Sequence, residues 1–164
     1  WQREPITNKP PYHRMDEPTV YEAADGSVQM IIRDGAGSKK LIRTVSRDGG
    51  RTFPAPALTN YPDATSKNFA GRLSNAWFYL ISNPNPAGRD PLAIAFSREG
   101  WVYERPLALR AGAAPKRYNA RAQTRGSFQY PHAIEHAGSL WVVYSTNKED
   151  IEISEFRLAD LGLQ

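Results

Sequence analysis

The chain has 164 residues, 40% of them hydrophobic, which is enough for one ordinary domain with a sizeable core. It has no cysteine, which excludes disulfides, thiolate metal sites and a cysteine nucleophile, and no apolar run near the ~20 residues that span a bilayer. The formal net charge of +4 comes mainly from arginine, which suits capture of carboxylates as well as contact with nucleic acid. The compartment stays open, and a secreted or periplasmic protein is compatible with this composition. Because the sequence starts at Trp1 without an initiator methionine, we expect a mature product or an excised piece.

Six short segments have the composition of strands, since they are rich in β-branched and aromatic residues and are bounded by Gly, Pro, Asn or Asp. In chain order they are GSVQMIIRD (26–34), KLIRTVSRD (40–48), AWFYLIS (76–82), PLAIAFSRE (91–99), SLWVVYSTN (139–147) and DIEISEFRL (150–158). No stretch of twelve or more residues shows a helical stripe of apolar side chains. The sequence therefore predicts an all-β fold built from antiparallel meanders.

The second segment runs into SRDGGRTF (46–53), a turn that is longer than a two-residue Asp-Gly hairpin. The Asp48 carboxylate can accept hydrogen bonds from backbone N–H groups across the turn. The two glycines allow positive φ, and Phe53 is expected to hold the hairpin against its own sheet. A weaker copy, SREGWVY (97–103), follows about 50 residues later.

The chain also contains a longer internal repeat. EPTVYEAADGSVQMIIR (17–33) aligns with YPHAIEHAGSLWVVYS (130–145), and the alignment needs a gap of one residue. A third unit lies between them, at about 70–105. A period of about 50 residues, with about four strands in each unit, favours the blades of a β-propeller.

Together these features resemble the sialidase (neuraminidase) or BNR-repeat β-propellers. The turn Ser-x-Asp-Gly-Gly-x-Thr-Phe matches the Asp-box of that family, and residues 15–158 resemble the C-terminal half of a six-bladed propeller. The resemblance implies about three four-stranded blades after an N-terminal extension. The predicted bounds are 1–16 for the extension and 17–60, 70–109 and 127–160 for the blades.

The resemblance also implies a catalytic site, because four residues follow the order that the family uses. Tyr130 corresponds to the tyrosine nucleophile and Glu17 to the base that takes its proton. Arg33 and Arg89 correspond to two arginines that bind the carboxylate of the substrate. Since Glu17 and Tyr130 occupy the same slot in two blades, we expect them to converge near the propeller axis, within hydrogen-bond reach.

The chemistry accounts for these residue types. Sialic acid carries a carboxylate on its anomeric carbon, which would repel a carboxylate nucleophile, whereas a neutral tyrosine avoids the repulsion. Each residue also has a purely structural interpretation. Glu17 could cap the edge of a strand, and Arg33 or Arg89 could be solvated on the surface. Tyr130 could be a core aromatic.

Two histidines and one basic segment raise the question of other chemistry. His132, two residues after Tyr130, could line the same pocket and bind substrate. His132 and His136 would lie about 13 Å apart on an extended strand at ~3.3 Å per residue, which is too far for one ion, so no metal and no cofactor are predicted. The segment 110–126 is basic but lacks a stacking pattern, so no nucleic acid and no membrane partner are expected.

The family's first arginine and its general-acid aspartate have no counterpart in this sequence. Three blades alone would expose apolar blade surfaces, so we expect either a missing N-terminal half-propeller or a second copy, in a homodimer, to close the ring. The function that the resemblance implies is retaining hydrolysis of a terminal acidic sugar, by an exo-sialidase-like enzyme or its C-terminal half. The alternatives are a noncatalytic glycan-binding propeller and a polysaccharide lyase that uses Tyr130 and His132 on uronic acids.

Overall fold

The computed structural model describes residues 6, 14–118 and 126–163, which form three antiparallel sheets, here called blades 1, 2 and 3. Blade 1 contains β1 (Met15–Glu22), β2 (Val28–Asp34), β3 (Lys40–Ser46) and β4 (Ala57–Pro62). Blade 2 contains β5 (Phe69–Arg72), β6 (Phe78–Ser82), β7 (Leu92–Ser97) and β8 (Glu104–Arg110). Blade 3 contains β9 (Phe128–His136), β10 (Ser139–Thr146) and β11 (Asp150–Arg157), and a 3₁₀ turn, η1 (Leu158–Leu161), follows. The all-β prediction is confirmed.

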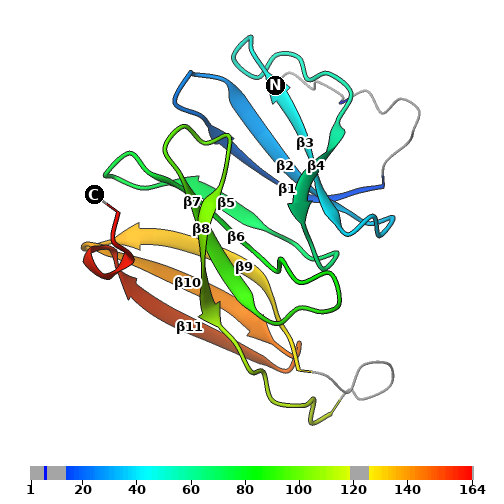
Figure 1. Cartoon of the computed structure of the whole chain (residues 1–164), viewed down its shortest axis with the longest axis vertical. Helices are drawn as coiled ribbons and strands as arrows, with labels where there is room; N and C mark the ends of the chain where they lie inside the picture. The colour runs from blue at the N-terminus through cyan, green and yellow to red at the C-terminus, as the bar shows by residue number, and fades with distance from the viewer. Residues whose placement is uncertain (1–5, 7–13, 119–125, 164) are drawn as a thin grey trace.

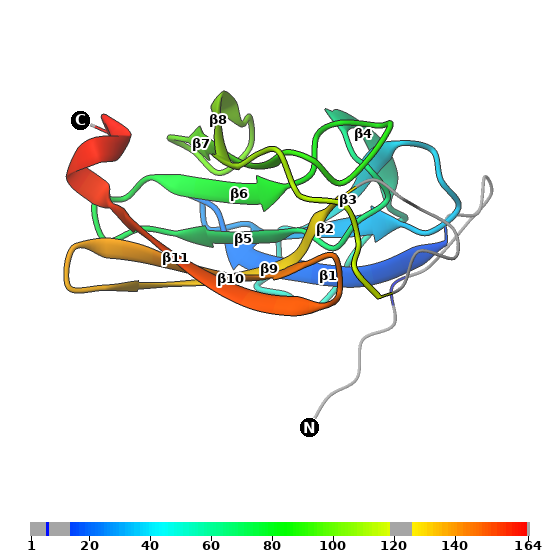
Figure 2. The ribbon, with the colours of Figure 1, turned by 90° about the horizontal axis from the view of Figure 1, so that it is seen from below.

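The three blades follow one another through the molecule, from blade 1 at the top of Figure 1 to blade 3 at the bottom. Their first strands are neighbours, because β5 packs beside β1 on one side and beside β9 on the other. Figure 2 shows β1 and β5 on the opposite side of their blades from β4 and β8. This arrangement, with β1, β5 and β9 as adjacent inner strands, is that of neighbouring propeller blades.

All six segments predicted as strands form strands, within one or two residues of the expected bounds. The sequence signal was weakest for β4 and β8, the outer strands of blades 1 and 2, whose side chains are largely exposed and which contain Pro62 and Pro106. Blades 1 and 2 have the expected four strands, and blade 3 has three within residues 126–163. No helix among the described residues is long and apolar enough to cross a membrane.

Two hydrophobic clusters hold the blades together, one at each interface of blade 2. Phe78 and Leu80 of β6 pack with Tyr21 and Ile31 of blade 1, and Ile81 and Ile94 belong to the cluster shared with blade 3. The residues of β6 and β7 are therefore buried on both faces, which explains their nearly continuous apolar sequence. The Tyr21 hydroxyl donates a hydrogen bond to the Gly100 carbonyl at 2.8 Å, and burial raises the pKa of Tyr21 to about 12.

The turn at 46–53 forms the hydrogen bonds expected of its aspartate. Asp48 Oδ1 accepts from the backbone N–H groups of Arg51 and Thr52 at 3.0 and 2.9 Å. Hydrogen bonds from the hydroxyls of Ser46 and Thr52, at 2.6 Å each, are the main reason that the pKa of Asp48 is strongly lowered. Gly49 and Gly50 both take positive φ, of 73° and 84°.

The weaker copy of this turn in blade 2 also has a hydrogen bond from a glycine to its serine. The Gly100 N–H donates to Ser97 Oγ at 2.9 Å, three residues back, whereas the Gly50 N–H donates to Ser46 Oγ at 2.9 Å, four residues back. Gly100 has a φ of 80°, and a Cβ there would lie 3.1 Å from the Phe78 ring. The glycine is therefore required both by the backbone conformation and by the packing between blades 1 and 2.

Candidate functional site

The site is built at the ends of the inner strands β1 and β9, where each strand has a bulge. The pairing of β1 with β2 shifts between Asp16 and Pro18, which leaves Glu17 out of the ladder with a φ of 33°. The ladder between β9 and β10 shifts in the same way beside Tyr130, whose φ is 56°. A bulge turns the side chain of its extra residue out of the pleat, and positive φ in a residue other than glycine is strained. Such strained bulges are found preferentially at functional sites.

Arg33 of β2 connects the two bulged residues. Its Nη1 donates a hydrogen bond to Glu17 Oε2 at 2.8 Å, and the arginine side chain is 17% exposed. Burial opposes the charge of Arg33, but the hydrogen bond and charge of Glu17, with smaller contributions from the Tyr130 hydroxyl, hold its pKa above the ordinary value. Glu17 and Tyr130 therefore approach the same guanidinium, and a direct hydrogen bond between them stays a prediction.

Arg89, from the loop between β6 and β7, reaches the same place from blade 2. It donates from Nη1 to Gln129 Oε1 at 2.6 Å and from Nη2 to the Thr65 carbonyl at 2.9 Å. Its guanidinium carbon lies 5.7 Å from the centre of the Tyr130 ring. The structure thus brings together Glu17, Arg33, Arg89 and Tyr130 from all three blades.

A buried asparagine that the sequence did not single out holds this loop to blade 3. Asn83, which is fully buried, donates from Nδ2 to the carbonyls of Arg89, Pro91 and Phe128, at 3.2, 3.0 and 2.9 Å. The Phe128 N–H in turn donates to the Arg89 carbonyl at 2.9 Å. Asn83 therefore fixes the position of Arg89 relative to the strand that carries Tyr130.

Asp63, also not singled out, is a buried carboxyl group that interacts electrostatically with both arginines. Its side chain accepts a hydrogen bond from the Ser66 N–H at 3.0 Å, and the residue is 1% exposed. Burial raises its pKa to about 6, although the charges of Arg33 and Arg89 act in the opposite direction. Asp63 is thus a carboxyl group that ionises close to neutral pH within the field of both arginines.

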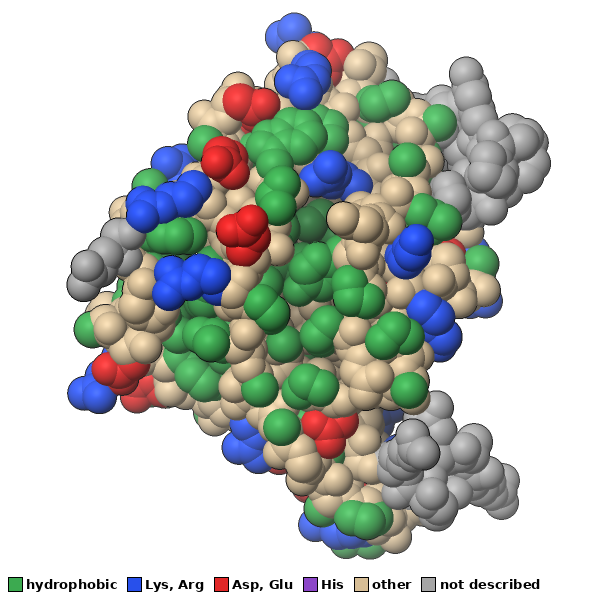
Figure 3. Space-filling view, viewed as in Figure 1, with side chains coloured by type: hydrophobic (Ala, Val, Ile, Leu, Met, Phe, Trp, Pro, Cys, Tyr) green, Lys and Arg blue, Asp and Glu red, His purple; other side chains and the backbone are tan. Residues whose placement is uncertain are grey.

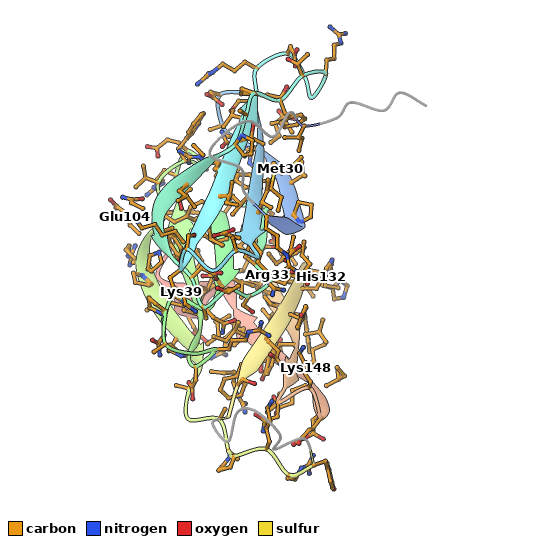
Figure 4. All side chains as sticks on the ribbon, turned by 90° about the vertical axis from the view of Figure 1, so that its right-hand side faces the viewer. Met30, Arg33, Lys39, Glu104, His132 and Lys148 are labelled. Atoms are coloured by element: carbon orange, nitrogen blue, oxygen red, sulfur yellow. The ribbon has the colours of Figure 1, made fainter. Side chains whose placement is uncertain are left out.

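Two lysines add positive charge at this end of the blades. Lys67 donates from Nζ to the Pro131 carbonyl at 2.8 Å, and burial lowers its pKa although Glu17 counteracts the effect. Lys148, in the turn between β10 and β11, places its Nζ 5.2 Å from the centre of the Tyr130 ring. Figure 4 views the molecule from the side where Arg33, His132 and Lys148 are labelled.

His132 of blade 3 contacts an aromatic side chain of blade 2. Its ring lies 4.2 Å, between centroids, from the ring of Phe69, and it lines an apolar groove on blade 3 with Ile134 and Trp141. A role for His132 in substrate binding stays a prediction. Within the described residues, no three histidine, aspartate or glutamate side chains gather closely enough to hold a metal ion.

Positive charge predominates around Tyr130. Three cations, Arg33, Arg89 and Lys148, lie near its ring or its hydroxyl, and a fourth, Lys67, donates to the carbonyl of the next residue, Pro131. The described carboxyl groups in this cluster are Glu17 and Asp63. Such an arrangement can bind an anion beside a tyrosine hydroxyl, and the arginines can do so through paired hydrogen bonds.

The model of the BNR repeat-like domain matches residues 1–143 of the sequence. The chain belongs to this BNR repeat-like family. A comparison of the sequence with curated proteins finds no match. The family assignment therefore rests on the domain match, and solved structures add information on the fold.

Among solved structures, this BNR repeat-like chain is similar to a leech intramolecular trans-sialidase, with 15% identity and a TM-score of 0.66, covering 88% of this chain and 24% of that one. It is similar to a Hadza microbial sialidase, with 15% identity and a TM-score of 0.69, covering 91% of this chain and 29% of that one. It is also similar to an α-L-arabinofuranosidase from Fusarium graminearum, with 16% identity and a TM-score of 0.61, covering 92% of this chain and 47% of that one. The fold is that of sialidase-type propeller blades, and the chain spans between a quarter and a half of the length of these neighbours.

The residues that sequence reasoning missed in this BNR repeat-like chain share one property. Asn83, Asp63 and Lys67 lie in or beside loops, and their roles come from contacts with other blades. Lys148 had one usable signal, since a lysine follows Asn147 in a tight hairpin, where glycine is usual.

Proposed function

We propose that this chain carries the active site of an exo-sialidase-like glycoside hydrolase, which cleaves a terminal acidic sugar with retention of configuration. The observation that carries the proposal is the convergence of Arg33 and Arg89 on Tyr130, with Glu17 hydrogen-bonded to Arg33. The cations would hold the sugar carboxylate, and the tyrosine would act beside them. The propeller fold, which it shares with glycosidases, is consistent with this function without fixing the sugar.

In the proposed reaction, the Tyr130 oxygen attacks the anomeric carbon and the bond to the leaving group breaks. The tyrosine proton passes to Glu17, and the leaving group departs as its oxyanion. Water then attacks the glycosyl-tyrosine bond, Glu17 returns the proton to the phenolate, and the proton lost by the water goes to the oxyanion. A sugar with an anomeric carboxylate favours this route, because the neutral tyrosine hydroxyl meets no charge repulsion.

The test is the release of phenol from aryl glycosides. We expect the chain to hydrolyse an aryl α-sialoside, whose good leaving group needs little help from an acid, and to leave an aryl α-L-arabinofuranoside intact. Proton NMR of the first product should show retained configuration at the anomeric carbon. Hydrolysis of the neutral arabinofuranoside in preference to the sialoside would contradict the assignment of the arginines to a carboxylate.

A noncatalytic glycan-binding propeller is the second candidate. The observation that favours it is the ion pair that engages Glu17 with Arg33 at 2.8 Å, because one oxygen of the carboxylate is then occupied by the guanidinium. In that case the chain would bind the acidic sugar and release no phenol from the sialoside.

We also propose that the outer face of blade 3 packs against a further propeller blade. Ile134, Ile151 and Ile153 are 60, 76 and 64% exposed, and with Trp141 and Val143 they form an apolar face opposite the core. The two faces of blade 2 are covered by neighbouring blades through similar apolar contacts. A hollow of about 570 Å³, lined by polar and apolar side chains, lies between blades 1 and 2, where Figure 3 shows hydrophobic side chains gathered.

An uncovered face of this kind should make the isolated chain associate with itself. We expect light scattering to give a native mass of at least twice 18.4 kDa. A mass of twice that value supports ring closure by a second copy. A stable monomer at high concentration would contradict the need for a partner blade.

A further inference from the structure

The turn between β10 and β11 holds two residues other than glycine at positive φ. Asn147 and Lys148 occupy its centre with φ of 61° and 59°, and the Glu149 N–H donates to the Thr146 carbonyl at 3.0 Å. Two successive residues at positive φ are typical of a type I′ turn, where the second position strongly favours glycine. A lysine there is strained, since its Cβ disfavours this backbone conformation.

The other hairpin of the same blade shows the favourable alternative. Between β9 and β10 the two central residues are Ala137 and Gly138, with φ of 49° and 77°. Blade 3 therefore uses glycine at the second position of one hairpin and lysine at the same position of the other. A strained residue that replaces a better one is a reason to look for a function of its side chain.

The strained turn is fixed in place by its neighbours. The Asn147 N–H donates to the Ser127 carbonyl, and the Ser127 N–H donates to Asn147 Oδ1, both at 2.8 Å. It also donates from Nδ2 to the Ala114 carbonyl at 2.9 Å, and Asn147 is only 5% exposed. Because Ser127 directly precedes β9, the turn keeps a fixed position relative to Tyr130.

The Lys148 side chain itself is exposed and lies beside the reactive tyrosine. Its Nζ is 5.2 Å from the centre of the Tyr130 ring, and the guanidinium carbon of Arg89 is 5.7 Å from the same centre. Arg33 approaches the hydroxyl of the ring. Three cations from three blades thus border one side chain, and a carboxylate with its four lone-pair directions can accept hydrogen bonds from all three.

We infer that Lys148 is a specificity residue of this site, which binds the carboxylate of an acidic sugar together with Arg33 and Arg89. The inference rests on the proposed function and deepens it. It supplies a third cation from within this chain, where the sequence provides only two arginines for that role. The strain at Lys148 is then the cost of placing an ammonium group at the mouth of the site.

The test is calorimetric titration of the full chain with N-acetylneuraminic acid and with its methyl ester, which has the same sugar without the charge. We expect the wild type to bind the acid more tightly than the ester. Lys148→Gly should weaken binding of the acid about tenfold, as expected for one lost charge-assisted hydrogen bond, and leave binding of the ester unchanged. Lys148→Arg should stay within about threefold of the wild type.

A melting curve separates this role from a structural one. Because glycine relieves the strained turn, Lys148→Gly should melt at or above the wild-type temperature while it loses affinity. Lys40→Gln is the control for net charge, because it removes the charge of an exposed lysine on β3. It should change the affinity neither for the acid nor for the methyl ester.

The outcomes separate the two proposals. If Lys148→Gly binds the acid as tightly as the wild type while Arg89→Gln loses binding, the inference on Lys148 is wrong and the proposed function stands. If the wild type does not prefer the acid to the ester, including the case in which it binds neither, the proposed function is wrong and the inference falls with it.

Discussion

Tyr130→Phe is expected to hydrolyse an aryl sialoside on the order of 10³-fold or more slowly than the wild type, while it binds N-acetylneuraminate with similar affinity. The change removes only the hydroxyl that would attack the anomeric carbon. The ring stays, and so do its contacts with Arg89 and Lys148, at 5.7 and 5.2 Å. Initial rates of phenol release and calorimetric titration measure the two effects separately.

Tyr118→Phe is the matched control, because Tyr118 is 80% exposed. It should hydrolyse the substrate at the wild-type rate. Glu17→Gln should lower the rate of hydrolysis, since the amide cannot take the tyrosine proton, with a smaller effect on binding. Equal hydrolysis by the wild type and Tyr130→Phe would exclude the tyrosine as the nucleophile, and binding without hydrolysis by the wild type would support the noncatalytic alternative.

Asp63→Asn is expected to stabilise the fold at neutral pH and not in acid. Burial raises the pKa of Asp63 from its ordinary value of 3.8 to about 6 in the folded chain. The folded state therefore holds the proton more tightly than the unfolded state, and this contribution to stability is complete below about pH 3.8 and is lost as the pH rises through about 6. Above that range the wild type should be less stable than Asp63→Asn by about 3 kcal/mol.

Urea unfolding of both proteins between about pH 4 and pH 8 measures this difference as a function of pH. The two free energies of unfolding should nearly coincide at the acid end and diverge toward pH 8. Glu104→Gln, at an exposed position on β8, should show no such divergence. If Asp63→Asn were the less stable protein at pH 8, the attraction of Arg33 and Arg89 for the carboxylate would outweigh its burial. A charged Asp63 therefore lowers the stability of the fold at neutral pH, in the field of two arginines that the proposed site needs.

Burial explains why the sequence identified some strands directly and not the outer strands β4 and β8. β6 and β7 are buried on both faces, so their apolar runs identify them directly. β4 and β8 lie at the outside of their blades, where polar and proline residues are tolerated and the periodic signal is lost. The prediction of a fourth strand for blade 3 came from the repeat and not from a pattern of its own.

The sequence by itself determined the local properties of this protein: the strand pattern, the turn around Asp48, the repeat that pairs the slots of Glu17 and Tyr130, and the order of the candidate residues. Only the tertiary structure decided which side chains share an environment. The pKa of Asp63 is raised to about 6 because packing buries it, and Lys148 belongs to the site because Asn147 ties its turn to the start of β9. The physical reason is that hydrophobic periodicity and turn propensity act over a few residues, whereas burial and charge depend on what packing between blades brings together.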